Sequence, residues 1–585
     1  MIKIPYGQSN FHRVMEEKFF YQDRTMYIRQ LEDNTSGLLF YLRPRRFGKS
    51  LFISMLHHYY GLEHKAQFEQ LFGKLAIGKK PTPKANSYLV LSFEFSRILT
   101  DTPQHTFEGF LSNVKEGVNI FLNEYSGFFK TEQRTTILSQ TTPHEIIKKL
   151  FEEYRYSEAS KIPHPIYILI DEYDHFANEL ISFNFDYFKE SVSQNGFVRK
   201  FYETIKTATR DGIVQRFFIT GVSPITVDSL TSGFNISTNI SLQPLFHKMM
   251  GFEEKEVVGV LKKIGVKSSE LPTVLDDLRD WYDGYLFTEE AKKHIYNTDM
   301  VLFFAQYYQQ YKKYPRDLLD TNIASDYGKI KNLFKIQNRE DENLQALQIL
   351  NETGSISAQL TTQYSFEKVF SQDDLVSLLF YMGFLTIEKA DLAGLIFKFP
   401  NFVIKRLYAD YFVSALQRYT DLPIDNSKMN ASIRLMANTG DLNPFFDQVS
   451  EILKRLSNRD AFHFNEMTLK AIFISCLHQQ QFYYVHSEYE TEKGYADVFL
   501  EAIRGYDPKY QMAFELKYIK KNDKNEAYKK IEDADIQKLL DKAESQLTDY
   551  MVSKKFITRK GLKGIVVICH GDKLIWREHK GFPIS

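Results

Sequence analysis

The chain has 585 residues, too many for a single hydrophobic core, and this length predicts about three domains. Its 74 basic and 74 acidic side chains cancel, so a site for a polyanion must be a local patch. The two cysteines, Cys476 and Cys569, exclude a disulfide framework and a cysteine-based zinc ribbon and suit a reducing compartment. Because the sequence shows neither the apolar core of a signal peptide nor an apolar run near the ~18 residues of a membrane span, we expect a soluble cytoplasmic protein.

Residues 38–56 read, in order, as an apolar strand, the basic turn Arg-Pro-Arg-Arg-Phe-Gly-Lys-Ser and an apolar helix. This is the context of a phosphate-binding loop, although Arg43 replaces the consensus glycine five positions before Gly48. In such a loop Gly48 admits backbone N–H groups to phosphate oxygens, Lys49 reaches the β- and γ-phosphates, and Ser50 holds Mg²⁺. Taken alone, the tripeptide Gly-Lys-Ser fits a basic surface turn equally well.

Residues 165–170 form a continuous apolar run, as expected for a strand that is covered on both faces. The run leads directly into Asp171 and Glu172. In P-loop NTPases an acid at this position holds Mg²⁺, and a neighbouring glutamate orients or deprotonates the attacking water. We therefore predict that Asp171 binds metal and nucleotide and that Glu172 is catalytic. The alternative, a solvated strand end, is weakened by the phosphate-binding loop upstream.

Together these motifs resemble those of a bacterial AAA-ATPase-like family whose members carry a PD-(D/E)XK nuclease domain at the C-terminus. The resemblance rests first on residues 42–52 and 170–174. It implies that Arg43 is a family trait and that residues 19–31 lie against the nucleotide base, where plain packing support is an equal alternative. Further segments match in the family's order at residues 220–223, 232–235, 281–285 and 296–297.

The run of residues 216–224 predicts another strand, which ends in small polar residues. In AAA-type ATPases a neighbouring strand often ends in a side chain that senses the γ-phosphate, so Thr220 or Ser223 is a candidate nucleotide-binding residue. A turn that caps a core strand would look the same. The sequence also contains three candidate charge-stabilising arginines and does not rank them: Arg199, Arg210 and Arg216.

The expected fold class is α/β multidomain, with a mostly helical region between two α/β regions. Residues 373–399 predict a helix and a hairpin, and a second helix is expected after Asn401, an arrangement compatible with a winged-helix module, whose use is more commonly structural or interdomain than DNA-binding. The polar stretch at residues 339–342 is the predicted linker. The predicted domains are an AAA-like P-loop ATPase core at 1–250, a helical lid at 251–335, a helical, winged-helix-like middle region at 336–448 and a PD-(D/E)XK nuclease-like domain at 449–585.

The C-terminal region contains a second chemical centre. Residues 494–502 predict an alternating strand that carries Asp497, and residues 510–519 predict a second strand. Alternation places Glu515 and Lys517 on one face of the second strand, and a hairpin can bring Asp497 beside them. Carboxylates are the ligands that Mg²⁺ prefers, and a metal there can activate water and stabilise charge on a phosphodiester. The adjacent lysine can polarise that water or the transition state.

An aspartate followed by Glu-Xaa-Lys resembles the core of a PD-(D/E)XK nuclease, a restriction-endonuclease-like α/β domain. The resemblance implies that Glu466, on the helix before the Asp497 strand, is another metal ligand. Gln546 and Tyr550, one helical turn apart, match the Gln-Xaa-Xaa-Xaa-Tyr element of the exonuclease-like branch and are candidate nucleic-acid-binding residues. The departure from the pattern is that no proline precedes Asp497.

These motifs predict an ATP-binding and ATP-hydrolysing protein with a metal-dependent nuclease domain. The expected cofactors are ATP and Mg²⁺, with Mn²⁺ as an alternative at the nuclease centre. The expected partner is nucleic acid, DNA in preference to RNA, and the sequence does not indicate an oligomeric state. The alternative is an ATP-regulated nucleic-acid-binding or signalling protein whose nuclease fold is inert.

Overall fold

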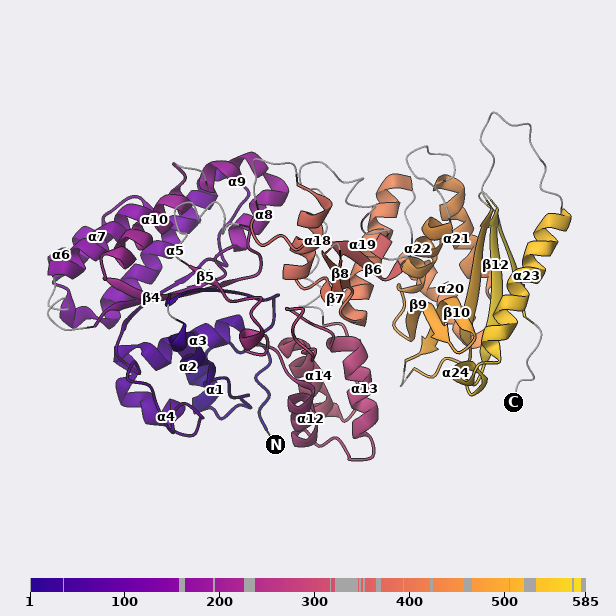
Figure 1. The fold of residues 1–585 in the computed structure, drawn as a ribbon, viewed down its shortest axis with the longest axis horizontal. Helices are drawn as coiled ribbons and strands as arrows, with labels where there is room; N and C mark the ends of the chain where they lie inside the picture. The colour runs from indigo at the N-terminus through magenta and orange to yellow at the C-terminus, as the bar shows by residue number, and fades with distance from the viewer. Residues whose placement is uncertain are drawn as a thin grey trace. The chain divides into compact units, whose positions relative to one another are not determined.

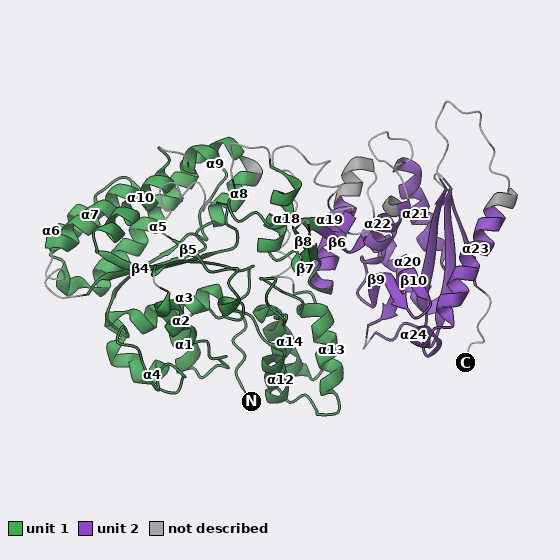
Figure 2. Cartoon of the chain, in the orientation of Figure 1, with its two compact units in different colours: residues 1–340, 357–401 green, residues 341–356, 402–585 purple. Residues whose placement is uncertain are grey.

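Contacts among the described residues divide the chain into two compact units (Figure 2). Unit 1 comprises residues 1–340 and 357–401, and unit 2 comprises residues 341–356 and 402–585. The four-part division expected from the sequence stays a prediction. The computed structural model describes residues 2–34, 36–156, 164–192, 195–225, 237–315, 317–320, 346, 349–350, 353–364, 370–392, 394–420, 425–456, 466–503, 506–519, 533–570 and 573–579.

Two segments singled out in the sequence lie outside the described residues, the predicted linker at 339–342 and the matching segment at 232–235. Among the helices that the structure describes, none is both long enough and apolar enough to cross a lipid bilayer.

A parallel sheet of five strands forms the centre of unit 1, in the order β2-β3-β4-β1-β5. Every residue of β1 and β3 is buried. For β3 this confirms the prediction of a strand covered on both faces. Because the strands are parallel, the carboxyl ends of β1, β3 and β4 meet at one edge of the sheet. The strands are β1 (Leu38–Leu42), β2 (Leu89–Glu94), β3 (Ile166–Asp171), β4 (Val214–Gly221) and β5 (Thr238–Asn239).

Helices cover both faces of this sheet, with α5, α7 and α10 on one side and α2 and α3 on the other (Figure 1). The longest, α5, begins where the Thr102 side chain caps the helix and Pro103 occupies its first turn. The α-helices up to residue 210 are α1 (Phe11–Glu16), α2 (Tyr27–Asp33), α3 (Lys49–Tyr60), α4 (Phe68–Phe72), α5 (Pro103–Glu124), α6 (Thr131–Leu138), α7 (Pro143–Tyr156), α8 (His175–Phe183), α9 (Phe185–Val192) and α10 (Phe197–Arg210).

The remainder of unit 1 is helical and ends in a hairpin. Ser371 and Asp374 form a capping box at the start of α18. The antiparallel hairpin of β7 and β8 follows, and β6 is a third strand that the sequence did not predict. Use of α12 to α14 as a lid stays a prediction. These elements are α12 (Glu254–Lys263), α13 (Leu271–Tyr282), α14 (Thr298–Tyr311), α18 (Gln372–Tyr381), β7 (Thr386–Asp391), β8 (Gly394–Lys398) and β6 (Ser355–Ala358), whose first two residues are assigned to unit 2.

Unit 2 contains a mixed sheet in the order β13-β12-β11-β10-β9. The central strand β11 pairs antiparallel with β10 and parallel with β12, which confirms the predicted hairpin of the Asp497 and Glu515 strands. The strands are β9 (Tyr483–Thr491), β10 (Gly494–Ala502), β11 (Gln511–Ile519), β12 (Leu562–His570) and β13 (Lys573–Glu578).

Two apolar cores cover the two faces of this sheet. Phe514 and Leu516 of β11 pack in the core that includes α20 to α22, whereas Ala513 packs in the core that includes α23. Strand alternation therefore places Glu515 and Lys517 on the side of Ala513 and α23. The helices of unit 2 are α19 (Phe402–Thr420), α20 (Asn426–Thr439), α21 (Asn443–Leu456), α22 (Glu466–Leu477), α23 (Asp533–Met551) and α24 (Lys554–Ile557).

Candidate functional sites

The predicted phosphate-binding loop joins β1 to α3, so strand, turn and helix occur in the predicted order. Gly48 precedes the helix with a φ of 96°, a left-handed conformation that glycine adopts without strain. Lys49 and Ser50 are the first two residues of α3, where backbone N–H groups have no partner within the helix. A helix start of this kind favours an anion.

The Lys49 side chain lies inside the curve of the loop. Its Nζ donates hydrogen bonds of 2.9 Å to the carbonyl oxygens of Arg43 and Pro44. Burial lowers the pKa of Lys49, against the attraction of Glu172 and Asp171. The ammonium is therefore held by neutral carbonyl groups close to two carboxylates.

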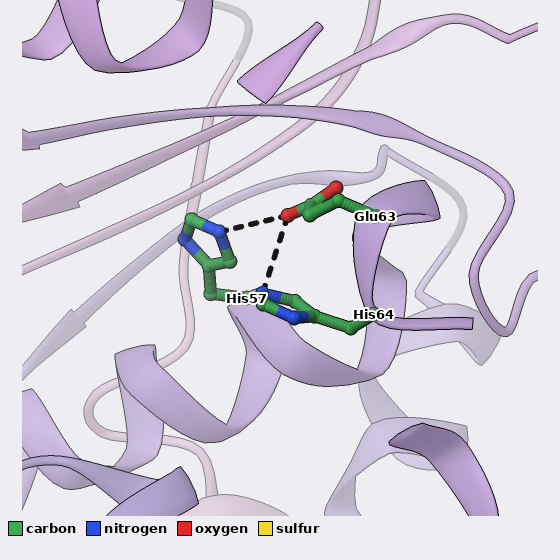
Figure 3. A group of neighbouring side chains, drawn as sticks. All are labelled: His57, Glu63 and His64. Carbon is green, nitrogen blue, oxygen red and sulfur yellow. Dashed lines mark hydrogen bonds and ion pairs between the residues drawn. The ribbon is translucent and has the colours of Figure 1, made fainter. Parts of the chain in front are cut away.

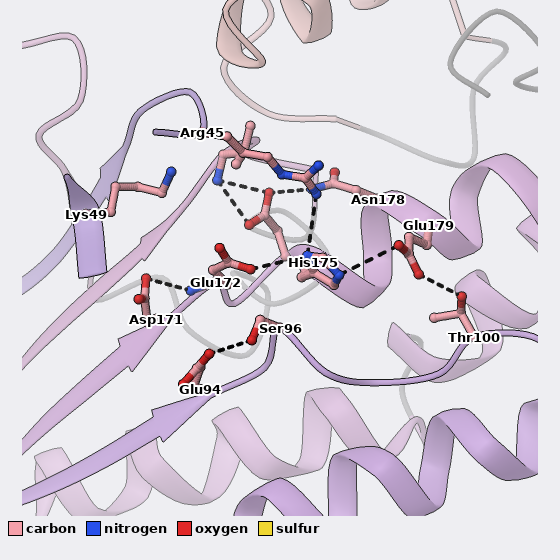
Figure 4. Close-up of polar contacts among 12 residues, drawn as sticks. Arg45, Lys49, Glu94, Ser96, Thr100, Asp171, Glu172, His175, Asn178 and Glu179 are labelled. Carbon is pink, nitrogen blue, oxygen red and sulfur yellow. Dashed lines mark hydrogen bonds and ion pairs between the residues drawn. The ribbon is translucent and has the colours of Figure 1, made fainter. Parts of the chain in front are cut away.

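Asp171 and Glu172 at the end of β3 lie beside the loop and have opposite pKa shifts (Figure 4). Burial raises the pKa of Asp171 to about 6, although a hydrogen bond with the Ser50 hydroxyl opposes the shift. Burial also disfavours the charged form of Glu172, but the hydrogen bond from His175 and the charge of Lys49 outweigh it and lower the pKa to about 2. At neutral pH Glu172 is thus fully ionised.

Two residues that the sequence did not single out contribute to the Glu172 environment. His175 Nδ1, in the first turn of α8, lies 3.2 Å from a Glu172 carboxylate oxygen. Arg45 of the loop reaches the same imidazole, with 3.5 Å between Nη2 and His175 Nδ1 (Figure 4). The only sequence signal for these two residues was position, since Arg45 lies within the predicted loop and His175 shortly follows Glu172.

Neither small polar candidate at the end of β4 is shown to contact a phosphate position. Ser223 Oγ lies 3.0 Å from an Asp174 carboxylate oxygen, and the same carboxylate accepts the Val222 and Ser223 N–H groups. Thr220 is fully buried, and its hydroxyl has no hydrogen-bond partner within the described part of the chain. Its role at a γ-phosphate stays a prediction.

Arg43, at the position of the consensus glycine, is a buried structural residue. Its guanidinium carbon lies 4.3 Å from the centre of the Tyr41 ring and 4.2 Å from that of the Phe287 ring. The two terminal nitrogens donate to the carbonyl oxygens of Leu42, Ser241 and Phe246. Arg43 therefore ties the loop to Ser241 and Phe246, which lie 198 and 203 residues later in the sequence. Local sequence patterns cannot predict contacts over such a separation.

Replacing Arg43 with Met is expected to destabilise the protein by about 3 to 5 kcal/mol, because buried carbonyl groups lose their donors while the side-chain volume is kept. Urea denaturation followed by circular dichroism measures the loss. Arg13→Met is the matched control, since Arg13 is exposed and pairs with Glu17 on the surface. Equal stability of the two variants would show that Arg43 does not hold the loop.

Two adjoining pockets lie at the loop. Gly48, Leu51 and Thr298 line both. One pocket is mainly apolar, and residues 20–22 from the segment ahead of β1 line it, while the implied contact of this segment with the nucleotide base stays a prediction. The other is polar and contains most of the residues described above: Arg45, Lys49, Ser50, Glu172 and His175. An apolar pocket beside a cationic one has the polarity that the base and the phosphates of a nucleotide would require.

The second predicted centre is assembled in unit 2. Lys517 Nζ lies 2.9 Å from Glu515 Oε1 and 4.0 Å from Glu466 Oε1. Asp497 Oδ2 accepts the backbone N–H of Leu516 at 2.7 Å, which places this carboxylate next to β11. The structure thus brings together the three predicted acids and the predicted lysine.

Burial makes Asp497 and Glu515 hard to ionise, and the charge of Asp497 adds repulsion at Glu515. Burial, followed by the negative charge of Asp497, raises the pKa of Glu515 to about 7. Burial also raises the pKa of Asp497. Glu515 Oε2 is buried and has no hydrogen-bond partner among the described residues. A carboxylate pair with an unpartnered buried oxygen fits a hard divalent cation, whose charge would relieve the repulsion.

The two predicted nucleic-acid-binding residues lie on α23, on the Glu515 side of the sheet. Burial, followed by the charges of Glu515 and Asp497, raises the pKa of Tyr550. The Tyr550 hydroxyphenyl group is therefore within electrostatic reach of the acids. Gln546 Oε1 is buried without a partner in the part of the chain that the structure describes. Contact of either side chain with nucleic acid stays a prediction.

Sequence reasoning missed a lysine and an acid at this centre. Lys470 Nζ is ion-paired with Glu488 and lies 3.8 Å from Asp497 Oδ1. Lys470 follows Glu466 by one helical turn, so the shared face of α22 was a usable signal. Glu488 gave no such signal, because it reaches the site from β9, where its φ is 51°.

Family models of known proteins match both regions of the chain that contain these centres. Residues 5–231 match a family model described as "Predicted AAA-ATPase", and residues 464–579 match that of the PD-(D/E)XK nuclease superfamily. The phosphate-binding loop and β3 acids fall in the first match, and Glu466, Asp497, Glu515 and Lys517 fall in the second.

A curated relative, the "Uncharacterized protein in vnfD 5'region" of Azotobacter chroococcum mcd 1, is 27% identical over 312 residues. That alignment covers 52% of this chain and 52% of the relative, so the chain spans about half the length of the relative that it matches. The matches confirm the resemblance seen in the sequence: the chain carries an AAA-ATPase-like domain over residues 5–231 and a PD-(D/E)XK nuclease superfamily domain over residues 464–579, at the C-terminus.

Proposed function

We propose that this protein binds and hydrolyses ATP at the loop between β1 and α3 and cleaves phosphodiester bonds of nucleic acid, DNA in preference to RNA, at the carboxylate centre of unit 2. One observation carries the proposal: Asp497, Glu515 and Lys517 converge, and a buried Glu515 oxygen lacks a partner among the described residues. Two buried carboxylates that repel each other lower the stability of the folded protein when they are ionised. Their presence therefore favours a functional centre over an inert fold.

At the ATP site, the first turn of α3 and Lys49 would bind the β- and γ-phosphates. Ser50 and Asp171, which already share a hydrogen bond, would hold Mg²⁺, which supplies neutralisation of the phosphate charge when bound. Glu172, with a pKa of about 2, is a weak base at neutral pH. This low pKa favours orientation of the attacking water over removal of its proton, with His175 fixing the carboxylate.

At the nuclease centre, Asp497, Glu515 and Glu466 would hold Mg²⁺ or Mn²⁺, which supplies an activated water and a charge clamp when bound. Lys517 donates to Glu515 and lies where its ammonium can stabilise charge that develops on a phosphodiester. Lys470, whose Nζ lies 3.8 Å from Asp497 Oδ1, would position that carboxylate. Gln546 and Tyr550 on α23 would contact the nucleic-acid strand.

The pH dependence of cleavage follows from Glu515. Its carboxyl group is neutral below a pKa of about 7 and charged above it, so metal binding improves as pH rises. At limiting Mg²⁺ we expect the initial cleavage rate to increase about tenfold from pH 6 to pH 8. Excess Mg²⁺ should move the midpoint to lower pH, because the cation competes with the proton. Rates measured across this range at two Mg²⁺ concentrations test both effects, and a midpoint indifferent to Mg²⁺ would argue against Glu515 as a ligand.

The second candidate is an ATP-regulated nucleic-acid-binding protein with an inert nuclease centre. The observation in its favour is that two lysines, Lys470 and Lys517, already lie against the acids and partly neutralise them. Incubation of the purified chain with labelled DNA and RNA, with and without Mg²⁺, separates the candidates. Binding without any cleavage would favour the inert alternative.

A further inference from the structure

Outside both centres, three ligating side chains meet where the helix that follows the phosphate-binding loop ends (Figure 3). His57 lies in the last turn of α3, and Glu63 and His64 lie in the 3₁₀ helix Leu62–Gln67. His57 Nε2 is 3.0 Å from Glu63 Oε1, and His64 Nε2 is 3.3 Å from the same oxygen. Both imidazole rings are thus directed at one carboxylate oxygen.

These separations are close to those of a metal site. Tetrahedral Zn²⁺ with bonds of about 2.0 to 2.1 Å holds its ligand atoms about 3.4 Å apart. The two distances to Glu63 Oε1 are within about 0.4 Å of this spacing, and the three ligand atoms all lie within 4.8 Å of one another, so small side-chain movements would admit the ion between them. The side chains of His57, Glu63 and His64 are 18%, 16% and 19% exposed, which leaves a limited path from solvent.

A second layer of contacts fixes two of the three ligands. His57 Nδ1 lies 3.0 Å from Ser92 Oγ on β2, which leaves Nε2 for the ion. The Tyr125 hydroxyl donates to Glu63 Oε2, the oxygen that does not face the histidines, and accepts the Val90 N–H at 2.9 Å. Such outer contacts orient metal ligands and are a general feature of protein zinc sites.

We propose that His57, Glu63 and His64 bind a divalent transition-metal ion, with Zn²⁺ as the best match. Two imidazole nitrogens and one carboxylate suit Zn²⁺, whereas Mg²⁺ prefers oxygen ligands alone. The fourth position is open to water or to Glu124, whose Oε2 lies 4.0 Å from His57 Nε2. The ion would fasten the end of α3 to the 3₁₀ helix and, through Ser92 and Tyr125, to β2 and the segment after α5. This metal would stabilise the unit that carries the ATP site without taking part in either proposed reaction.

Zinc titration of the full-length chain tests the proposal. The protein is stripped with a chelator, returned to excess Mg²⁺ so that the oxygen-lined centres are filled, and titrated with Zn²⁺ by calorimetry. We expect one Zn²⁺ per chain and a rise in melting temperature, both lost in the His57→Gln/His64→Gln variant. Both should persist in Asp497→Ala, which alters only the nuclease centre. His105→Gln is the matched control, since His105 pairs with Asp101 alone among the described residues, in an exposed position.

Ser92→Ala provides a variant that keeps all three ligands and should fold normally. Loss of its contact with His57 is expected to weaken Zn²⁺ binding about tenfold. The proposal is overturned if the wild-type chain binds no more Zn²⁺ than the double histidine variant. It is also overturned if Ser92→Ala binds Zn²⁺ as tightly as the wild type. In those cases the three residues form a hydrogen-bonded cluster only.

Discussion

The Lys49→Ala variant is expected to bind ATP at least about 100-fold more weakly than the wild-type chain. Its ammonium, now held by the Arg43 and Pro44 carbonyl groups, is placed to exchange these neutral partners for phosphate oxygens. Hydrogen bonds to charged groups contribute about 1.5 to 3 kcal/mol each, and the upper end of this range corresponds to the predicted factor. Calorimetry with ATP and Mg²⁺ measures it, and Lys148→Ala, at an exposed position on α7, is the control.

The Glu172→Gln variant complements Lys49→Ala, because the first substitution is expected to slow hydrolysis and the second to weaken ATP binding. Glutamine keeps the shape of Glu172 but not the charge that orients water, so ATP binding should stay within about twofold while phosphate release slows at least about 100-fold. Binding and phosphate release are measured on the same preparations. Hydrolysis at the wild-type rate in both variants would remove this loop as the ATPase site.

Glu515→Gln is expected to reduce nucleic-acid cleavage at least about 10³-fold while the protein stays folded. Cleavage is lost because an amide is a poor ligand for Mg²⁺ and no longer pairs with Lys517. Stability is kept because burial raises the pKa of Glu515, so its ionisation opposes folding above pH 7 and the neutral amide removes that cost. The melting temperature at pH 8 should therefore be equal to or higher than that of the wild type.

A control for this variant comes from the same sheet. Glu578 of β13 pairs with Lys563 and, among the described residues, makes no polar contact with the carboxylate centre, so Glu578→Gln should cut at the wild-type rate. If Glu515→Gln also cuts normally, Glu515 is not a metal ligand. If it loses both cleavage and its cooperative melting transition, its role is in folding.

The backbone of both centres was predictable because it follows from short-range patterns. The unalternated runs before Gly48 and Asp171 predict buried parallel strands, whose carboxyl ends must meet at one edge of the sheet. Alternation along β11 predicts that Glu515 and Lys517 share a face. In each case the spacing of apolar residues determines where the polar ones project.

What could not be predicted depends on partners that are distant in sequence. Arg43 looks like part of an exposed basic turn, and its burial is decided by carbonyl groups and rings from beyond residue 240. Lys470 and Glu488 meet because a helix and a strand pack together, not because of any motif. The meeting of His57 with Glu63 and His64 requires the chain to leave α3 at Gly61, a turn that residue spacing does not encode.

The most direct test of the proposed nuclease activity is the cutting of an end-labelled linear DNA by the intact chain, with Mg²⁺ and with chelator, beside Asp497→Ala prepared in the same way. We expect the wild-type chain to shorten the DNA only when Mg²⁺ is present, and the variant to leave it intact, because Asp497 would hold the ion that activates the water. Cutting that persists in chelator or in Asp497→Ala, or an absence of cutting by the wild-type chain on both DNA and RNA, would contradict the proposal.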